Sequence, residues 1–177
     1  VGCLAGPVVA AAVILRPDTD IELLRDSKKL SESQREKTAE KIKEQAIAWA
    51  IGSASVEEIT QLNIRGADFL AMKRALAQLK FVPDAVLSDG FRIPELTTYN
   101  EAIIKGDQKS RSIAAASIVA KVFRDSLMRE YEAQFPGYGF AKHKGYGTKM
   151  HCDALSKFGP CSIHRMTFAP VRESIRY

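Results

Sequence analysis

The apolar positions along the chain follow two different periodicities. Residues 7–15 form a continuous apolar and β-branched run, which is typical of a strand buried on both faces. Shorter apolar runs predict further strands over residues 49–53, 85–89 and 102–104. In the segments between these runs, apolar residues recur at helical spacing. This pattern predicts helices over residues 31–46, 55–62, 64–79, 110–134 and 149–158.

Short polar signals mark the ends of these elements. Ser31 followed by Gln34 has the spacing of a capping box, and Ser55 is a suitable cap for the next helix. Pro136 and Gly137 end the long helix, and a loop, a helix and an irregular tail follow. Strands interleaved with helices predict an α/β fold with a largely covered sheet. No repeat or low-complexity linker divides the chain, so a single domain over residues 1–177 is expected.

The composition is that of a globular protein, with 46% hydrophobic and 27% charged residues. No apolar run approaches the roughly 20 residues of a membrane span, and no signal-peptide pattern is present. We therefore expect a cytoplasmic protein with no membrane partner. The three cysteines form no zinc spacing and predict reduced thiols, with one Cys152–Cys161 disulfide as the alternative.

The positive charge is concentrated at the C-terminal end of the chain. The formal charge is +5, yet residues 1–137 hold 19 basic and 19 acidic residues. Residues 138–177 hold seven basic and two acidic residues, together with all three histidines. A local positive field favours a polyanion such as nucleic acid, although a solvated basic surface explains the same charge.

Two aspartates follow predicted strands and are candidate metal ligands. Asp89 ends the run Leu87-Ser88-Asp89-Gly90, and Asp107 follows the run that ends at Gly106. Ligands bind at strand ends in open α/β sheets, and paired carboxylates suit Mg²⁺ or Mn²⁺. Aspartate is also common in turns because of its local hydrogen bonds, so each residue could simply be a turn residue.

A second candidate site combines lysines, glycines and an aromatic residue in residues 142–148. Glycine lets a backbone approach a phosphate, lysine neutralises the phosphate, and Tyr146 can stack on a sugar or base. The alternative is a mobile surface loop. Ser27, Lys28 and Lys29 could likewise meet a phosphate or form an ordinary charged turn. The histidines are too scattered to predict a zinc site.

Several motifs together resemble the bacterial type of ribonuclease HII. They occur in the family's order and cover nearly the whole chain: LAGPVVAAAVIL (4–15), DSKKLS (26–31), VLSDG (86–90), KGD (105–107), SIAAASIVAK (112–121), YGF (138–140), HKGYGT (143–148) and HRMTFAPV (164–171). The resemblance implies a ribonuclease H-like mixed sheet flanked by helices, with a helical C-terminal portion.

The resemblance also implies an activity and a set of functional residues. The activity is metal-dependent cleavage of the RNA strand of RNA–DNA hybrids, and incision on the 5′ side of ribonucleotides embedded in a DNA duplex, by a monomer. Asp89 and Asp107 match two of four carboxylates that hold Mg²⁺ or Mn²⁺. Tyr146 matches the tyrosine that senses the ribose 2′-hydroxyl, the group that distinguishes RNA from DNA. Further substrate contacts are expected at Gly2, Lys28, Lys144 and Lys149.

The chain departs from the family pattern at its start. In the family, a motif Asp-Glu-x-Gly-Arg-Gly precedes the segment that begins at Leu4, and its strand lies at the centre of the sheet. The chain begins Val1-Gly2-Cys3, and no residue supplies the Asp-Glu pair. We therefore expect a fragment of an intact enzyme, with impaired activity. The alternative is a non-catalytic nucleic-acid-binding module of the same fold.

Overall fold

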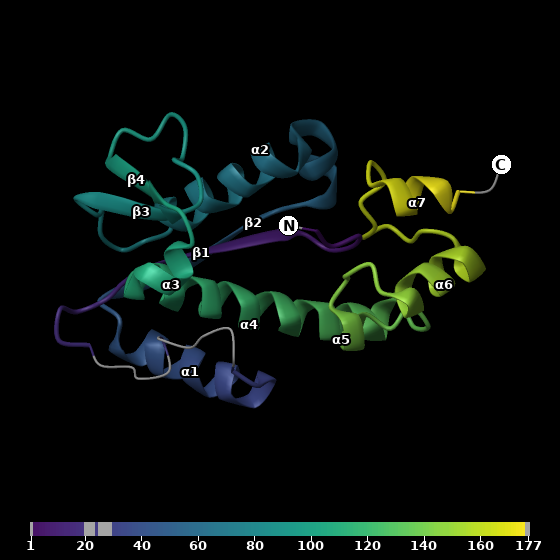
Figure 1. Cartoon of the computed structure of the whole chain (residues 1–177), viewed down its shortest axis with the longest axis horizontal. Helices are drawn as coiled ribbons and strands as arrows, with labels where there is room; N and C mark the ends of the chain where they lie inside the picture. The colour runs from purple at the N-terminus through teal and green to yellow at the C-terminus, as the bar shows by residue number, and fades with distance from the viewer. Residues whose placement is uncertain (1, 20–23, 25–29, 176–177) are drawn as a thin grey trace. The chain divides into compact units, whose positions relative to one another are not determined.

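The computed structural model describes residues 2–19, 24 and 30–175; strands and helices alternate as far as β3, and β4 is followed by helices (Figure 1). Most predicted elements are present with boundaries close to those expected. In chain order the elements are β1 (Val8–Ile14), α1 (Glu32–Gln45), β2 (Ala48–Ala54), α2 (Val56–Ala77), β3 (Ala85–Asp89), β4 (Tyr99–Ile103), α3 (Gly106–Lys109), α4 (Arg111–Gln134), α5 (Phe140–His143), α6 (Lys149–Phe158) and α7 (Ala169–Glu173).

The chain divides into two compact units, each assembled from segments far apart in the sequence. Unit 1 contains Val1–Val8, Ala54–Asp68 and Phe123–Tyr177, and unit 2 contains Val9–Ser53 and Phe69–Val122. The expectation of a single domain over residues 1–177 stays a prediction. None of the helices in the part of the chain that the structure describes is long and apolar enough to cross a membrane.

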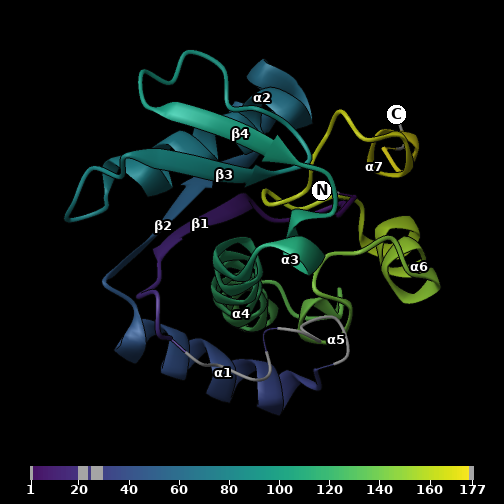
Figure 2. The ribbon, with the colours of Figure 1, turned by 60° about the vertical axis from the view of Figure 1, so that its left-hand side comes forward.

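The strands form two separate pairs. β1 is hydrogen-bonded to β2, and β3 pairs in parallel with β4, with Val86 opposite Asn100 and Asp89 opposite Ile103 (Figure 2). Within the described residues, β1 and β3 are not hydrogen-bonded to each other. The predicted mixed sheet is thus present as two two-stranded sheets, and the turns that follow β3 and β4 position the acidic residues discussed below.

The core of unit 2 lies between α1 and the first half of α4. The predicted capping box is formed at the start of α1, where Ser31 and Gln34 exchange side-chain-to-backbone hydrogen bonds. The helix then buries Ala39 and Ile42 against small residues of α4, including Ala114 and Ala115. The small side chains of α4 therefore let α1 pack close to it.

The core of unit 1 gathers aromatic and histidine side chains from the C-terminal part of the chain. Met128 of α4, Phe140 of α5 and Ala154 of α6 pack together with Tyr138 and Ile163. The N-terminal segment runs through this unit. Its Leu4 N–H donates to the Gly145 carbonyl, and its Gly6 N–H donates to the Ile163 carbonyl, each at 2.8 Å.

Several boundaries differ from the sequence-based expectation. The strand predicted over residues 102–104 begins three residues earlier and ends at Ile103, so Asp107 lies on the short helix α3 and not at a strand end. The two helices predicted over residues 55–62 and 64–79 are both present within α2 and meet where expected, because Asn63 has a non-helical conformation with φ 58°. The short helices α5 and α7 were not predicted, because four or five residues are too few to show helical periodicity.

Candidate functional site

An acidic turn in unit 2 brings together the ends of β3 and β4. Asp89 is the last residue of β3, and its exposed carboxylate Oδ1 accepts a hydrogen bond of 2.8 Å from the Gly106 N–H. The backbone closes the same turn, because the Gly90 N–H donates to the Ile103 carbonyl at 3.0 Å. Asp107 directly follows Gly106. The turn therefore places the two predicted metal ligands at one edge of the β3–β4 pair.

The backbone conformation of residues 105–107 fixes the position of Asp107. Lys105 adopts the left-handed conformation, with φ 57°, and the chain then enters α3, whose first turn contains Asp107. A side chain at Gly106 would meet Cδ1 of Ile113 at 2.6 Å and Oδ1 of Asp89 at 3.3 Å. A Cβ at this position would displace the end of the Ile113 side chain and shift the Asp89 carboxylate by a few tenths of an ångström, so glycine favours the observed turn.

The donor set of the acidic turn suits a hard divalent cation. Both candidate ligands are carboxylates, and oxygen ligands are those that Mg²⁺ and Mn²⁺ prefer. Across residues 2–19, 24 and 30–175, however, no group of three or more histidine, cysteine, aspartate or glutamate side chains could hold a metal ion. The residues present therefore fit a metal site, but as a partial set of ligands.

Tyr146 lies in a loop of unit 1 that is anchored on both sides. It forms an antiparallel bridge with Cys3, and its N–H donates to the His143 carbonyl at 2.9 Å. Its side chain is 46% exposed, so the phenol can meet a ligand. Burial of the remaining half raises the pKa of the phenol, and the neighbouring Cys3 raises it further. The hydroxyl is therefore protonated at neutral pH and able to donate a hydrogen bond.

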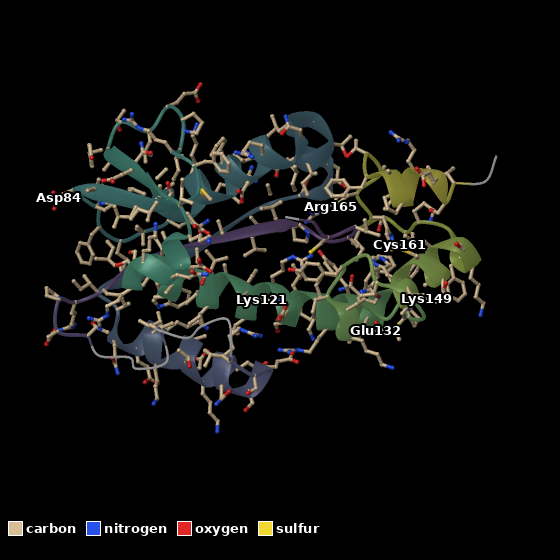
Figure 3. The ribbon with its side chains drawn as sticks, viewed as in Figure 1. Asp84, Lys121, Glu132, Lys149, Cys161 and Arg165 are labelled. Atoms are coloured by element: carbon tan, nitrogen blue, oxygen red, sulfur yellow. The ribbon has the colours of Figure 1, made fainter. Side chains whose placement is uncertain are left out.

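Two arginines of unit 1 hold the segments that flank Tyr146. Arg124 donates from its guanidinium to the carbonyls of Lys144, at 2.7 Å, and of Ala5, at 2.9 Å. Arg165 is only 1% exposed and donates from Nε to the Gly6 carbonyl at 2.9 Å (Figure 3). Burial lowers the pKa of the Arg165 guanidinium to about 10, which still leaves it charged at neutral pH. Both side chains thus act as cross-links between segments distant in the sequence.

The other predicted substrate-contact residues have diverse surroundings. Gly2 is exposed and precedes Cys3, and Lys28 lies outside the described residues. Lys144 ends α5, and its ammonium donates to the Ala141 carbonyl at 2.7 Å. Lys149 begins α6 and forms an exposed ion pair of 2.8 Å with Asp153, four residues later (Figure 3). Exposed ion pairs of this kind contribute little stability and exchange readily, so a phosphate can replace Asp153.

The sequence did not predict that the three histidines would lie together. His151 and His164 are fully buried in unit 1, and His143 is nearly so. Their spacing along the chain shows no pattern, because α5, α6 and the following loop bring them together only in the folded chain. The three cysteines are free thiols, as predicted.

Solved structures with the same arrangement define the class of protein. The chain aligns with ribonuclease H2 from Pyrococcus horikoshii OT3 with a TM-score of 0.77 and 25% identity, over 98% of this chain and 92% of that one. It aligns with Bst-RNase HIII in complex with Mn²⁺ with a TM-score of 0.75 and 18% identity, over 98% and 65% of the two chains. The protein therefore has the α/β fold of the ribonucleases H2 and H3, as expected.

Sequence comparison then identifies the family. The ribonuclease HII family profile matches residues 1–171. Ribonuclease HII of Vibrio campbellii is 52% identical over 174 residues, which are 98% of this chain and 82% of that relative. Ribonuclease HII of Coxiella burnetii (strain Dugway 5J108-111) is 55% identical over 172 residues, or 97% and 85%. The chain belongs to the ribonuclease HII family, and its activity is that of a ribonuclease H endonuclease acting on nucleic acid.

Proposed function

We propose that the protein is a metal-dependent endonuclease that cuts the RNA strand of RNA–DNA hybrids and incises DNA on the 5′ side of an embedded ribonucleotide. The observation that carries this proposal is the hydrogen bond from the Gly106 N–H to the Asp89 carboxylate, which holds the end of β3 next to Asp107. The bond orients one carboxylate at the turn that carries the other. A monomer acting in the cytoplasm, in the removal of ribonucleotides from DNA, is part of the proposal.

Asp89 and Asp107 would hold Mg²⁺ or Mn²⁺, and Mn²⁺ is present in the related Bst-RNase HIII structure. When bound, such an ion activates water and stabilises the negative charge that develops on the phosphate during hydrolysis, leaving a 5′-phosphate on the product. The role of the protein residues is to orient. The Gly106 N–H holds Oδ1 of Asp89, which leaves the second oxygen of that carboxylate available for a ligand.

The substitution Asp89→Asn tests the metal site. The amide keeps the size of the side chain and an oxygen for the Gly106 N–H, but it removes the negative charge. We expect Mg²⁺ affinity, measured by isothermal titration calorimetry, to fall at least about tenfold, while binding to duplex nucleic acid is retained. Asp153→Asn is the matched control, since Asp153 forms an exposed ion pair with Lys149 at the surface of α6. Equal Mg²⁺ affinity in Asp89→Asn and the parent protein would show that Asp89 is a turn residue.

Residues 1–177 by themselves are expected to cleave slowly. The described residues contain no cluster of three or more candidate ligands, and metal affinity follows the number and charge of the ligands. We expect weak Mg²⁺ binding and little cleavage of a labelled DNA duplex that contains one ribonucleotide. Rapid cleavage would mean that other residues replace the Asp-Glu pair of the family motif.

Tyr146 is the proposed sensor of the ribose 2′-hydroxyl. Its exposed ring can lie against a sugar, and its protonated hydroxyl can donate to the 2′-oxygen. The test is the ratio of the dissociation constants for an all-DNA duplex and for the same duplex with one ribonucleotide, measured in EDTA so that no cleavage occurs. Tyr146→Ala should lower this ratio about fivefold or more. An unchanged ratio would remove the sensor role.

A second candidate function is a non-catalytic nucleic-acid-binding module, and the incomplete ligand set among the described residues favours it. The two functions differ in one assay. The endonuclease releases product from an RNA–DNA hybrid in Mg²⁺ or Mn²⁺, even if slowly. The module binds the hybrid under the same conditions and releases no product.

A further inference from the structure

The three histidines of unit 1 form one continuous buried cluster. The rings of His143 and His151 are stacked with centroids 4.3 Å apart, and the His164 ring lies 5.2 Å from that of His151. The closest polar contact joins Nε2 of His151 to Nε2 of His164 at 3.0 Å. Phe140 lies edge-on to His151 and excludes water from this side of the ring. The contact between the two Nε2 atoms requires one ring to donate and the other to accept.

The backbone groups at the two ends of the cluster fix which ring donates. Nδ1 of His151 lies 3.0 Å from the Tyr146 carbonyl oxygen, which can only accept, so Nδ1 carries a proton. In a neutral imidazole the other nitrogen is then an acceptor, so Nε2 of His164 must donate to Nε2 of His151. Nδ1 of His164 is left as an acceptor, and the Cys161 N–H, which can only donate, lies 2.9 Å from it.

The hydrogen bonds therefore run in one direction, from the Cys161 N–H through His164 and His151 to the Tyr146 carbonyl. Each neutral ring uses one donor and one acceptor. The Cys161 carbonyl also lies near Nδ1 of His164, at 3.3 Å, but this contact is longer than the 2.9 Å contact from the Cys161 N–H, and the carbonyl already accepts from the His164 N–H at 3.0 Å. We call these four groups the imidazole relay. Within the relay, His151 holds the peptide carbonyl of Tyr146, together with the Thr148 N–H, which donates to the same carbonyl at 2.8 Å.

We infer that His151 and His164 are positioning residues for Tyr146: the imidazole relay fixes the Tyr146 peptide, and a proton added to the relay in acid releases it. This inference rests on the proposed role of Tyr146 in sensing the ribose. The two rings do not touch the substrate in this proposal. They act by restricting the orientation of the Tyr146 peptide, and so the direction in which the phenol leaves the loop.

Protonation breaks the relay because an imidazolium has two N–H groups and no acceptor. A proton on Nε2 of His151 would face the Nε2–H of His164 across 3.0 Å. A proton on Nδ1 of His164 would face the Cys161 N–H across 2.9 Å. Either event places two donors opposite each other and breaks their contact. A ring that turns to separate the two donors also loses the hydrogen bond of its other nitrogen, and for His151 this is the bond to the Tyr146 carbonyl.

The surroundings of the relay keep it neutral at physiological pH. Three further titratable side chains pack against the two rings in the described part of the chain: His143 of α5 stacks on His151, while Tyr138 and Cys161 contact His164. None of the three is a carboxylate, which would favour a charged imidazolium beside it, and burial raises the pKa of both Tyr138 and Cys161. Burial and His151 lower the pKa of His164 to about 4, and burial lowers the pKa of His151.

Paired substitutions at each histidine separate positioning from a merely structural role. In His151→Asn the amide nitrogen can replace Nδ1 as donor to the Tyr146 carbonyl, whereas His151→Ala removes that donor. In the same way, His164→Gln retains a donor toward His151 and His164→Ala does not. The readout is the EDTA binding ratio for all-DNA and ribonucleotide-containing duplexes. We expect the alanine variants to lower the ratio about fivefold and the amide variants to retain most of it.

A double-mutant cycle with Tyr146→Ala completes the test. If the relay acts through Tyr146, His151→Ala lowers the binding ratio in the parent protein and has no further effect once Tyr146 is alanine. An equal loss in both backgrounds, or no loss in the parent protein, would overturn the inference. If Tyr146→Ala alone leaves the ratio unchanged, the proposed function of Tyr146 fails, and the state of the relay is then decided by a measurement that needs no substrate.

That measurement is ¹⁵N NMR of the histidine side chains as the pH is lowered from 8 to 4. The relay predicts a proton on Nδ1 of His151 and on Nε2 of His164, with both rings neutral at pH 6. It also predicts that the Thr148 amide, which shares the Tyr146 carbonyl, shifts when the rings protonate. The opposite tautomers, or titration of the His151 or the His164 ring near pH 6.5, would show that the relay does not exist, whatever the activity of the protein.

Discussion

Arg165 shows how a single buried charge can join the two ends of the chain. Its guanidinium donates to the carbonyls of Gly6, at 2.9 Å, and Pro7, at 3.2 Å. The Arg165 N–H also donates to the Leu4 carbonyl at 2.8 Å. The sequence predicted only an irregular tail in this region, whereas His164 and Arg165 are fully buried. Which carbonyls they meet depends on chain segments about 160 residues away.

Replacing Arg165 with methionine should therefore destabilise the protein by about 3 kcal/mol, because two buried carbonyls lose their donors. Urea unfolding followed by far-ultraviolet circular dichroism measures the change. Arg172→Met is the matched control, since Arg172 is exposed on α7 and its loss should change the free energy of unfolding by less than about 0.5 kcal/mol. Similar values for the two variants would contradict the structural role of Arg165.

The pKa of His164 predicts how stability changes with pH. Its folded-state pKa, about 4, lies below the ordinary value of 6.5, so between these values the unfolded chain binds more protons. The contribution of the neutral His164 ring to the free energy of unfolding is fully present above pH 6.5. It is lost as the pH falls toward 4, by up to about 1.4 kcal/mol per pH unit. Urea unfolding at several pH values should show a smaller decline in His164→Gln than in the parent protein. An equal decline in both would mean that His164 is not buried as a neutral ring.

At the scale of whole elements, the distance between β2 and α2 depends on how their side chains and backbones pack. The sequence predicted both elements, and it also placed the caps, since Ser55 and Glu58 exchange hydrogen bonds at the start of α2. It did not predict how closely the strand and the helix approach. A side chain at Gly52 would lie 2.2 Å from the Ala71 carbonyl oxygen and 2.4 Å from the Ala75 nitrogen, both in the backbone of α2. Glycine is thus the only residue that allows this packing.

Gly52→Ala should consequently force β2 away from α2 and lower the free energy of unfolding by about 2–3 kcal/mol. Thermal or urea unfolding would detect the change. Gly2→Ala serves as the control for stability, since nothing lies within 4 Å of a Cβ at Gly2. If Gly52→Ala unfolded at the same urea concentration as the parent protein, the two elements would have to be further apart than the structure places them.

The elements that sequence reasoning missed are short. α3, α5 and α7 contain four or five residues each, and their formation depends on surrounding contacts. Propensity cannot stabilise a single helical turn, so local sequence carries too little information to predict one. This is why Asp107 was expected at a strand end and instead lies on α3.

At the scale of the whole molecule, the charge distribution predicts the binding behaviour. The excess of basic residues lies in residues 138–177, and Lys144 and Lys149 are among those expected to meet the nucleic-acid backbone. Each lysine that neutralises a phosphate releases counterions, so affinity should fall steeply with salt. We expect the logarithm of the association constant to decline against the logarithm of salt concentration with a slope between about −3 and −5.

Fluorescence anisotropy with a labelled RNA–DNA hybrid at several salt concentrations gives this slope. Lys149→Gln should make the slope less steep by about one, whereas Lys43→Gln should leave it unchanged, because Lys43 pairs with Glu40 on α1 outside the basic segment. A slope near zero would mean that the basic residues form only a solvated surface. Equal slopes for the two variants would exclude Lys149 as a phosphate contact.

The sequence by itself determined the family and the α/β class, and it predicts which residues carry the chemistry. Motifs, caps and apolar periodicity are local properties, and the residues around Asp89, Asp107 and Tyr146 retain them in any conformation. Tertiary structure alone decided the hydrogen bond of Asp89 to Gly106 and the meeting of His151 with His164. These contacts join residues that are 17 and 13 positions apart, and only the packing of intervening elements brings such groups within 3 Å of each other.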